Sequence, residues 1–386
     1  MIVVIADDLT GAAELGGLGL KYGLHVEVAT SVDFHSKADL LIISTDTRSM
    51  EKQRAVDEMI KVTSLVKKMK PAMIYKKVDS VLRGHVVDEL TAQLKVLDLS
   101  RALLVPANPS LGRTIHNGTY FIHDQPVHLT AFSSDPEFPV VDSRVLNMLG
   151  GSTSFIRVKT VEEELPEAGI VVGEATTGSD LRTWASKAGI KNTLLAGGAG
   201  FFSAVLERMH LNKGLNTEGT ETELGHPRLF VCGSTFDKSR QSIRDIKMRG
   251  GPVSYMPFSI IESTQPSENL YNEWCQEVVK LLSERGKAII AIDKTTTETA
   301  KISAKDLRVK TATIVSQVIK STHISELIVE GGSTASAIIR KLGFTKFFPV
   351  KEYAMGVVRM KVDGRENLYF TLKPGSYHWP NPIWNF

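Results

Sequence analysis

The first stretch of the chain, Ile2-Val-Val-Ile-Ala-Asp7-Asp8-Leu-Thr10-Gly-Ala12, decides the fold class. Its opening run is apolar at every position rather than at every second one, which is typical of a strand covered by helices on both faces. A helical pattern follows at 13–21. Two acids therefore stand at the carboxyl end of a buried strand, where open parallel sheets bind their ligands.

The same pattern recurs along the chain. Further short apolar runs alternate with helical patterns, at 26–29, 40–43, 72–75, 102–105, 229–232, 288–292 and 326–329. This alternation predicts an α/β protein with largely parallel sheets and flanking helices.

The length of 386 residues exceeds the roughly 250 to 300 residues at which a single core stops growing, so we expect two domains. Residues 211–227 are polar, rich in glycine and without helical or strand period, and this composition predicts the linker. The expected domains are 1–215 and 227–386, each built on its own sheet, with the active site in the cleft between them.

The composition limits the partners. Lys plus Arg number 46 and Asp plus Glu 43, a net charge of +3 that is too small to attract nucleic acid or an anionic membrane. Cys232 and Cys275 have neither CxxC spacing nor a histidine cluster, so no zinc site is expected and a reducing cytoplasm fits. No apolar run is long enough to cross a membrane. We expect a cytoplasmic protein that acts on a small molecule, with a homodimer as the candidate assembly.

Charged residues gather at two of the predicted strand ends. Asp7 and Asp8 can hold a metal, accept a proton or cap a helix, although capping needs only one of them. Lys77, Asp79 and Arg83 follow another strand, where an arginine fork suits a carboxylate and a lysine suits phosphate. The alternative for this second segment is a solvated helix start with Asp79 as its cap.

Further candidates follow other strands. Arg113 lies in a long polar segment after the strand at 102–105, among groups that can surround a polyhydroxylated ligand. In the second half, glycine turns occur at Gly233-Ser234, at 331–335 and at Gly375. Glycine lets backbone N–H groups approach phosphate oxygens, so three such turns predict a nucleotide site. The chain has no GxxxxGK[ST] motif, which excludes a P-loop enzyme.

A serine hydrolase is the competing interpretation. Gly331-Gly-Ser333-Thr-Ala335 differs from a nucleophile elbow only at its last position, and Asp363 and His378 follow in hydrolase order. Against this interpretation, few residues remain after the elbow to complete a hydrolase sheet, and the acids and cations of the first half would have no role.

Taken in order, these segments resemble the four-carbon acid sugar kinase family, whose members phosphorylate threonate, erythronate or 3-oxo-tetronate with ATP. The resemblance rests on residues 7–12, 77–84, 112–114 with Asp135-Pro136 downstream, and 331–335, and it spans nearly the whole chain. It departs from the family pattern at Val81, His85 and Asn108, and at Tyr377-His378 after the last glycine turn. The His378 departure keeps open a third class, a sugar-acid sensor without catalysis.

The resemblance implies an N-terminal sugar-acid domain and a C-terminal nucleotide domain. It places Asp7, Arg83 and Arg113 on the substrate, with Asp8, Asp79 and Lys77 as the catalytic candidates. The ATP site would be formed by Ser234, Gly331, Gly332, Ser333, Thr334 and Gly375. The hypothesis is transfer of the γ-phosphoryl group to a terminal hydroxyl. Mg²⁺ would be held mainly by phosphates and water, so no protein metal site is expected.

Overall fold

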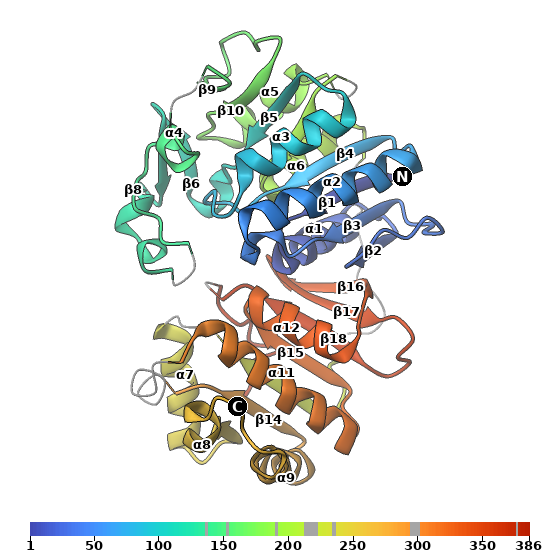
Figure 1. The fold of residues 1–386 in the computed structure, drawn as a ribbon, viewed down its shortest axis with the longest axis vertical. Helices are drawn as coiled ribbons and strands as arrows, with labels where there is room; N and C mark the ends of the chain where they lie inside the picture. Colours follow the sequence, from blue (N-terminus) through green and yellow to red (C-terminus); the bar gives the residue numbers. More distant parts are fainter. Residues whose placement is uncertain are drawn as a thin grey trace. The chain divides into compact units, whose positions relative to one another are not determined.

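The computed structural model describes residues 1–135, 138–151, 154–189, 192–211, 223–233, 237–293, 302–375 and 377–386. Internal contacts divide the chain into two compact units, unit 1 at Met1–Asn216 and unit 2 at Thr217–Phe386 (Figure 1). Of the predicted linker, residues 212–222 lie outside the described part of the chain.

Unit 1 is built on a sheet whose described strands all run parallel, in the order β2-β3-β1-β4-β11-β5-β10-β9. The strands are β1 (Ile2–Ala6), β2 (Val26–Ala29), β3 (Leu40–Ser44), β4 (Met73–Lys77), β5 (Arg101–Val105), β9 (Ile156–Lys159), β10 (Gly169–Gly173) and β11 (Leu194–Gly197). Every residue of β1 and β3 is buried, because helices cover both faces.

The helices of unit 1 pack in two groups, α2 with α3, and α1 with α6 and α5. Lys76 and Lys77 show that the groups lie on opposite faces, since successive strand residues point to opposite sides. Lys76 Nζ lies 2.5 Å from Glu89 of α3, whereas Lys77 Nζ lies 3.6 Å from Glu14 of α1. The helices are α1 (Leu9–Lys21), α2 (Lys52–Met69), α3 (Val86–Leu97), α4 (Val145–Met148), α5 (Gly178–Lys187) and α6 (Ala199–Arg208).

Short elements complete unit 1. A small antiparallel sheet consists of β6 (Arg113–His116), β7 (Thr119–Ile122) and β8 (Gln125–Pro126). The 3-10 helices are η1 (Thr47–Ser49), η2 (Pro109–Leu111), η3 (Val127–Leu129) and η4 (Ala131–Ser134). They matter here because η1 and η4 bring polar and aromatic side chains to the strand ends.

Unit 2 has the strand order β13-β14-β12-β15-β18-β17-β16, parallel from β13 to β18 and antiparallel beyond. The strands are β12 (Arg228–Cys232), β13 (Val253–Tyr255), β14 (Lys287–Ala291), β15 (Glu326–Glu330), β16 (Lys346–Ala354), β17 (Val357–Val362) and β18 (Tyr369–Lys373). The helices are α7 (Asp237–Met248), α8 (Phe258–Glu262), α9 (Glu268–Arg285), α11 (Ala304–Ser321) and α12 (Gly332–Leu342). Helices α11 and α12 lie side by side (Figure 1).

The predicted α/β class with largely parallel sheets is confirmed, and each of the eight apolar runs forms a strand. The sequence patterns missed β9 to β11, β13 and the antiparallel pair β16 and β17. Strand β10 begins and ends with glycine, and β16 is half-exposed over much of its length, so neither gives the continuous apolar run of a buried strand. Among the described helices, none combines the length and the apolar character that crossing a membrane requires.

Candidate active site

Asp7 and Asp8 stand at the carboxyl end of β1 and are both almost fully buried. Asp8 is the N-cap of α1: its backbone is extended and its carboxylate accepts a 2.8 Å hydrogen bond from the Gly11 N–H. The Thr10 hydroxyl donates to the same carboxylate. Capping therefore explains Asp8 locally, but it does not explain why Asp7 is buried beside it.

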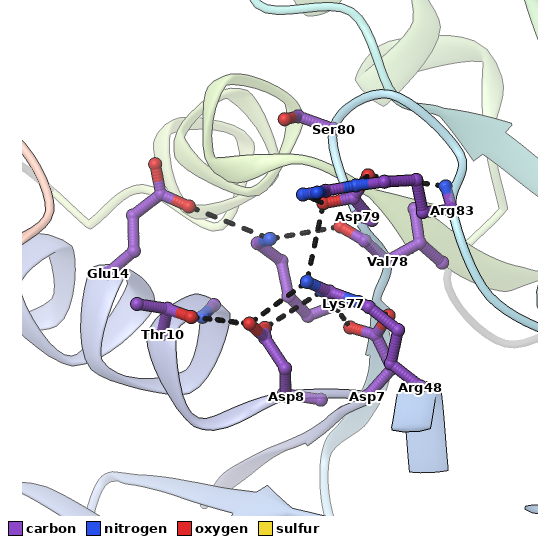
Figure 2. Close-up of polar contacts among 12 residues, drawn as sticks. Asp7, Asp8, Thr10, Glu14, Arg48, Lys77, Val78, Asp79, Ser80 and Arg83 are labelled. Carbon is purple, nitrogen blue, oxygen red and sulfur yellow. Dashed lines mark hydrogen bonds and ion pairs between the residues drawn. The ribbon is translucent and has the colours of Figure 1, made fainter. Parts of the chain in front are cut away.

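Arg48 explains why Asp7 is buried beside Asp8, and no sequence pattern pointed to this arginine. It lies in η1, directly after β3, which is the neighbour of β1 in the sheet. Its Nε and Nη2 donate to the two oxygens of Asp7 at 2.9 and 3.0 Å, and its Nη1 donates to Asp8 at 3.0 Å. Its Nη1 also lies 3.5 Å from Asp79 Oδ1. One arginine thus joins three buried aspartates from two strand ends (Figure 2).

Asp79 organises the segment between β4 and α3. It accepts hydrogen bonds from Arg83 Nε and Nη2, each at 2.8 Å, and from the Val81 N–H at 3.2 Å. Arg83 reaches further with Nη1, which donates to Asp135 at 2.6 Å. Three of the five N–H donors of Arg83 therefore go to carboxylates of the protein, and the guanidinium is held rigidly at the site.

The charges of the cluster set its protonation. Burial alone would raise the pKa of Asp8, but Arg48, Lys77 and the two hydrogen bonds to Asp8 hold that pKa below its ordinary value. Burial would also raise the pKa of Asp79, but the positive charges of Arg83 and Arg48 outweigh this effect. The pKa of Asp79 therefore lies well below its ordinary value. Both groups are carboxylates at neutral pH.

Lys77 is buried at the carboxyl end of β4, beside the start of α1. Its Nζ donates to the Val78 carbonyl at 2.9 Å and lies 3.6 Å from Glu14. A Cβ added to Gly11 would lie 2.9 Å from this Nζ and 2.8 Å from Asp8 Oδ1. An alanine at position 11 would therefore force the Asp8 or the Lys77 side chain to move.

Arg113, at the start of β6, joins the same cluster. It donates to the hydroxyl of Ser80, the residue after Asp79. The ring of Phe132, in η4, lies 5.2 Å from the guanidinium of Arg83 and 6.0 Å from that of Arg113. The six predicted residues of the first half are thus brought together. Asp135 and Phe132 come from the segment after η3; Asp135 belongs to the motifs of the family resemblance, whereas no sequence pattern selected Phe132.

Unit 2 contains the glycine turns. Gly331 has φ 97° and is the N-cap of α12, a backbone conformation that favours glycine, and Gly332, Ser333 and Thr334 form the first turn of that helix. A Cβ added to Gly233 would lie 2.3 Å from Thr334 Oγ1, so the turn after β12 packs directly on the first turn of α12. Gly375 follows β18, and Ser234 lies outside the described residues.

These features fit a phosphate-binding site. A helix N-terminus offers backbone N–H groups and a positive dipole end, and the N-cap residue of α12 is a glycine, which has no side chain to cap them. The turns after β12, β15 and β18 also lie at the carboxyl ends of neighbouring parallel strands. The predicted residues Gly331, Gly332, Ser333 and Thr334 are contiguous at this helix start.

Comparison with known families decides the identity. A model of the sugar-binding N-terminal domain matches residues 2–205, and a model of the nucleotide-binding C-terminal domain matches residues 229–377. The chain belongs to the four-carbon acid sugar kinase family. Membership makes it a sugar-acid kinase, and the two matched regions fall within unit 1 and unit 2.

Two curated relatives and one solved structure illustrate the similarity. The kinase is 25% identical to a D-threonate kinase of Salmonella typhimurium, over 89% of its own length and 86% of the relative's. It is 24% identical to a 3-oxo-tetronate kinase of Actinobacillus succinogenes, over 98% and 96% of the two chains. A crystal structure of a Haemophilus influenzae protein shares the fold with a TM-score of 0.71 at 22% identity, covering 97% of each chain.

A hollow in unit 2 of the kinase lies next to the turn after β12. It is formed by Cys232 at the end of β12, by Tyr255 at the end of β13 and by Asp293 after β14, with Arg240 and Arg244 one turn apart on α7. Within the described ranges, no group of three or more His, Cys, Asp or Glu side chains is arranged to hold a metal ion. A metal ion at the site would therefore have to be held by groups other than a cluster of these side chains.

Proposed function

We propose that this sugar-acid kinase transfers the γ-phosphoryl group of ATP to the terminal hydroxyl of a four-carbon acid of the threonate, erythronate or 3-oxo-tetronate type. The observation that carries the proposal is the Arg48-centred cluster, in which Asp7, Asp8 and Asp79 meet two further cations, Lys77 and Arg83, at neighbouring strand ends. Two rigid arginines suit a carboxylate, and fixed aspartates suit hydroxyl groups.

Arg83 and Arg113 would bind the acid's carboxylate. Arg83 uses three of its five N–H donors on Asp79 and Asp135, and two donors remain for a ligand within the described part of the chain. Because the same carboxylates hold the guanidinium in place, little side-chain freedom is lost when the acid binds. Arg113, which also lies near the Phe132 ring, adds a second cation for the same group.

Asp8 is our choice for the group that accepts the hydroxyl proton. The oxygens of Asp79 are engaged by the Arg83 side chain and by two backbone N–H groups, so Asp79 would act as the anchor of Arg83. A loose phosphoryl-transfer transition state asks little of a base, and a carboxylate that orients the hydroxyl is sufficient. Lys77 would neutralise charge on the transferred group.

The nucleotide part of the proposal rests on unit 2. The first turn of α12 and the glycine turns beside it would bind the phosphates of the nucleotide. When bound, Mg-ATP would supply the phosphoryl group, and its Mg²⁺ would neutralise phosphate charge. Gly331 and Gly233 provide the open backbone that close approach of a phosphate requires.

A coupled assay of ADP release tests the proposal. The panel comprises both enantiomers of threonate and erythronate together with 3-oxo-tetronate, each with Mg-ATP. The matched control is 2,3-dihydroxybutanoate, which keeps the carboxylate but lacks the terminal hydroxyl. We expect one or more acids of the panel to stimulate ADP release and the control to give none. If no acid stimulates release, the proposed substrate class is wrong, and acid binding without turnover would indicate a sensor instead.

A further inference from the structure

A buried ion pair lies at the carboxyl ends of two neighbouring strands of unit 2. Glu330 ends β15 and Lys373 ends β18, and the two residues are partners in the parallel register. Their relative exposures are 0% and 1%. Lys373 Nζ lies 3.6 Å from Glu330 Oε1, which is longer than a hydrogen bond, and within the described residues this oxygen accepts none. Such a pair is poorly optimised for stability alone, because burying both charges is costly.

Lys373 holds the turn that follows it. Its Nζ donates to the carbonyl of Pro374 at 2.8 Å and to that of Tyr377 at 2.6 Å, and the Gly375 carbonyl lies 3.5 Å away. The backbone carbonyl of Lys373 in turn accepts a 2.9 Å hydrogen bond from the Gly331 N–H. The last glycine turn and the glycine turn at α12 are therefore tied to the same lysine.

Glu330 extends the connection to the third turn. Its Oε2 accepts hydrogen bonds from Ser239 Oγ at 2.8 Å and from Trp379 Nε1 at 3.0 Å. Ser239 lies in α7, the helix that follows the turn after β12, and the Trp379 ring also lies 5.1 Å from Lys373 Nζ. One carboxylate thus links elements next to all three glycine turns.

We propose that Glu330 and Lys373 are positioning residues that set the three glycine turns for the phosphates of the nucleotide. The inference rests on the proposed use of ATP. Neither side chain would touch the nucleotide, because both are buried beneath the turns and their polar atoms face protein groups. Their effect would be transmitted through the carbonyl groups of the last turn and through the position of α7.

The same strand provides a matched control. Glu326 begins β15 and pairs with Arg359 of β17, and the relative exposures of these residues are 0% and 2%. This second ion pair is also buried, but it lies at the amino end of β15, away from the glycine turns. Breaking it should destabilise unit 2 in the same manner as breaking the Glu330 pair, and should leave the turns in place.

The experiment measures Mg-ADP binding by isothermal titration calorimetry, together with thermal unfolding, for E330Q, K373M, E326Q and R359M in the full chain. We expect E330Q and K373M to raise the Kd for Mg-ADP about tenfold or more, and E326Q and R359M to lose comparable stability with a Kd within about twofold of the wild type. In kinetic assays, the KM for ATP should rise in E330Q and the KM for the sugar acid should stay constant.

The variants S239A and W379F cover the case in which E330Q does not fold. Each removes one hydrogen bond to Glu330 and keeps the ion pair, and we expect a rise in the Mg-ADP Kd of about threefold. If E330Q or these milder variants lose stability and bind Mg-ADP like the wild type, the pair is purely structural and the inference is wrong. A wild-type protein that fails to bind Mg-ADP would instead overturn the proposed use of ATP itself.

Discussion

Replacing Arg48 by methionine removes the cation that joins three buried aspartates. The arginine side chain is 14% exposed and lies within 3.0 Å of oxygens of Asp7 and Asp8 and 3.5 Å from Asp79. Removing one partner of a buried ion pair costs about 3 to 5 kcal/mol of unfolding free energy. For a unit of this size each kcal/mol lowers Tm by about 2 to 4 °C, so we expect a fall of about 6 °C or more at pH 7.

The dependence on pH identifies the cause. Since the folded-state pKa values of Asp8 and Asp79 lie below the unfolded ones, these groups stabilise the wild type above the unfolded pKa near 3.9, and that stability is lost as pH falls through the folded pKa. In R48M the folded-state pKa values rise, so acid destabilises the variant less. The difference in Tm between the two proteins should therefore be largest at pH 7 and should narrow as the pH falls below about 4.

The assay is thermal unfolding by circular dichroism at several pH values between 7 and about 2. R54M is the matched control, since Arg54 is an exposed arginine at the start of the neighbouring helix α2. Surface substitutions of this kind change stability by about 0.5 kcal/mol or less. An R48M protein as stable as R54M at pH 7, or a Tm difference that stays constant with pH, would refute the electrostatic role of Arg48.

Three further predictions concern individual groups. Asp8→Asn keeps the helix cap but removes the proton acceptor, so kcat should fall about 100-fold in steady-state assays. Asp79→Asn should chiefly raise the KM for the acid. The opposite pattern would exchange the roles of the two aspartates. Gly331→Ala and Gly343→Ala both place alanine at positive φ, at opposite ends of α12, and should each cost about 1 kcal/mol or more in thermal unfolding. Only Gly331→Ala should weaken Mg-ADP binding by calorimetry, and an equal loss of affinity in both variants would contradict the phosphate role of the turn. Gly11→Ala puts a Cβ 2.8 Å from an Asp8 oxygen and should lower kcat/KM about tenfold, and unchanged kinetics would show that this region tolerates movement.

The strand ends were predictable because buried parallel strands have a direct sequence pattern. The apolar run at 2–5 predicted a strand, and the acids after it predicted a candidate site at the end of that strand. The same reasoning selected Lys77, Asp79 and Arg83. Strands such as β10 and β16 were not predicted, because glycine and half-exposed polar residues interrupt their apolar runs. The antiparallel edge of unit 2 was therefore not expected.

Arg48 was missed for a different reason. It is remote from Asp7 in sequence and reaches it only because β3 lies beside β1 in the sheet, and strand order is not encoded in any local pattern. The same holds for Glu330 and Lys373, which meet because β15 and β18 are neighbours. Sequence patterns thus located the groups at each strand end, whereas the pairing of those groups required the topology.

The proposed reaction must yield a phosphorylated four-carbon acid as its product. Mass spectrometry of each acid after incubation with the kinase and Mg-ATP would detect this product directly. We expect one phosphate to be added to at least one acid of the threonate, erythronate or 3-oxo-tetronate type, and none to 2,3-dihydroxybutanoate. Formation of ADP with every acid recovered unmodified would contradict the account.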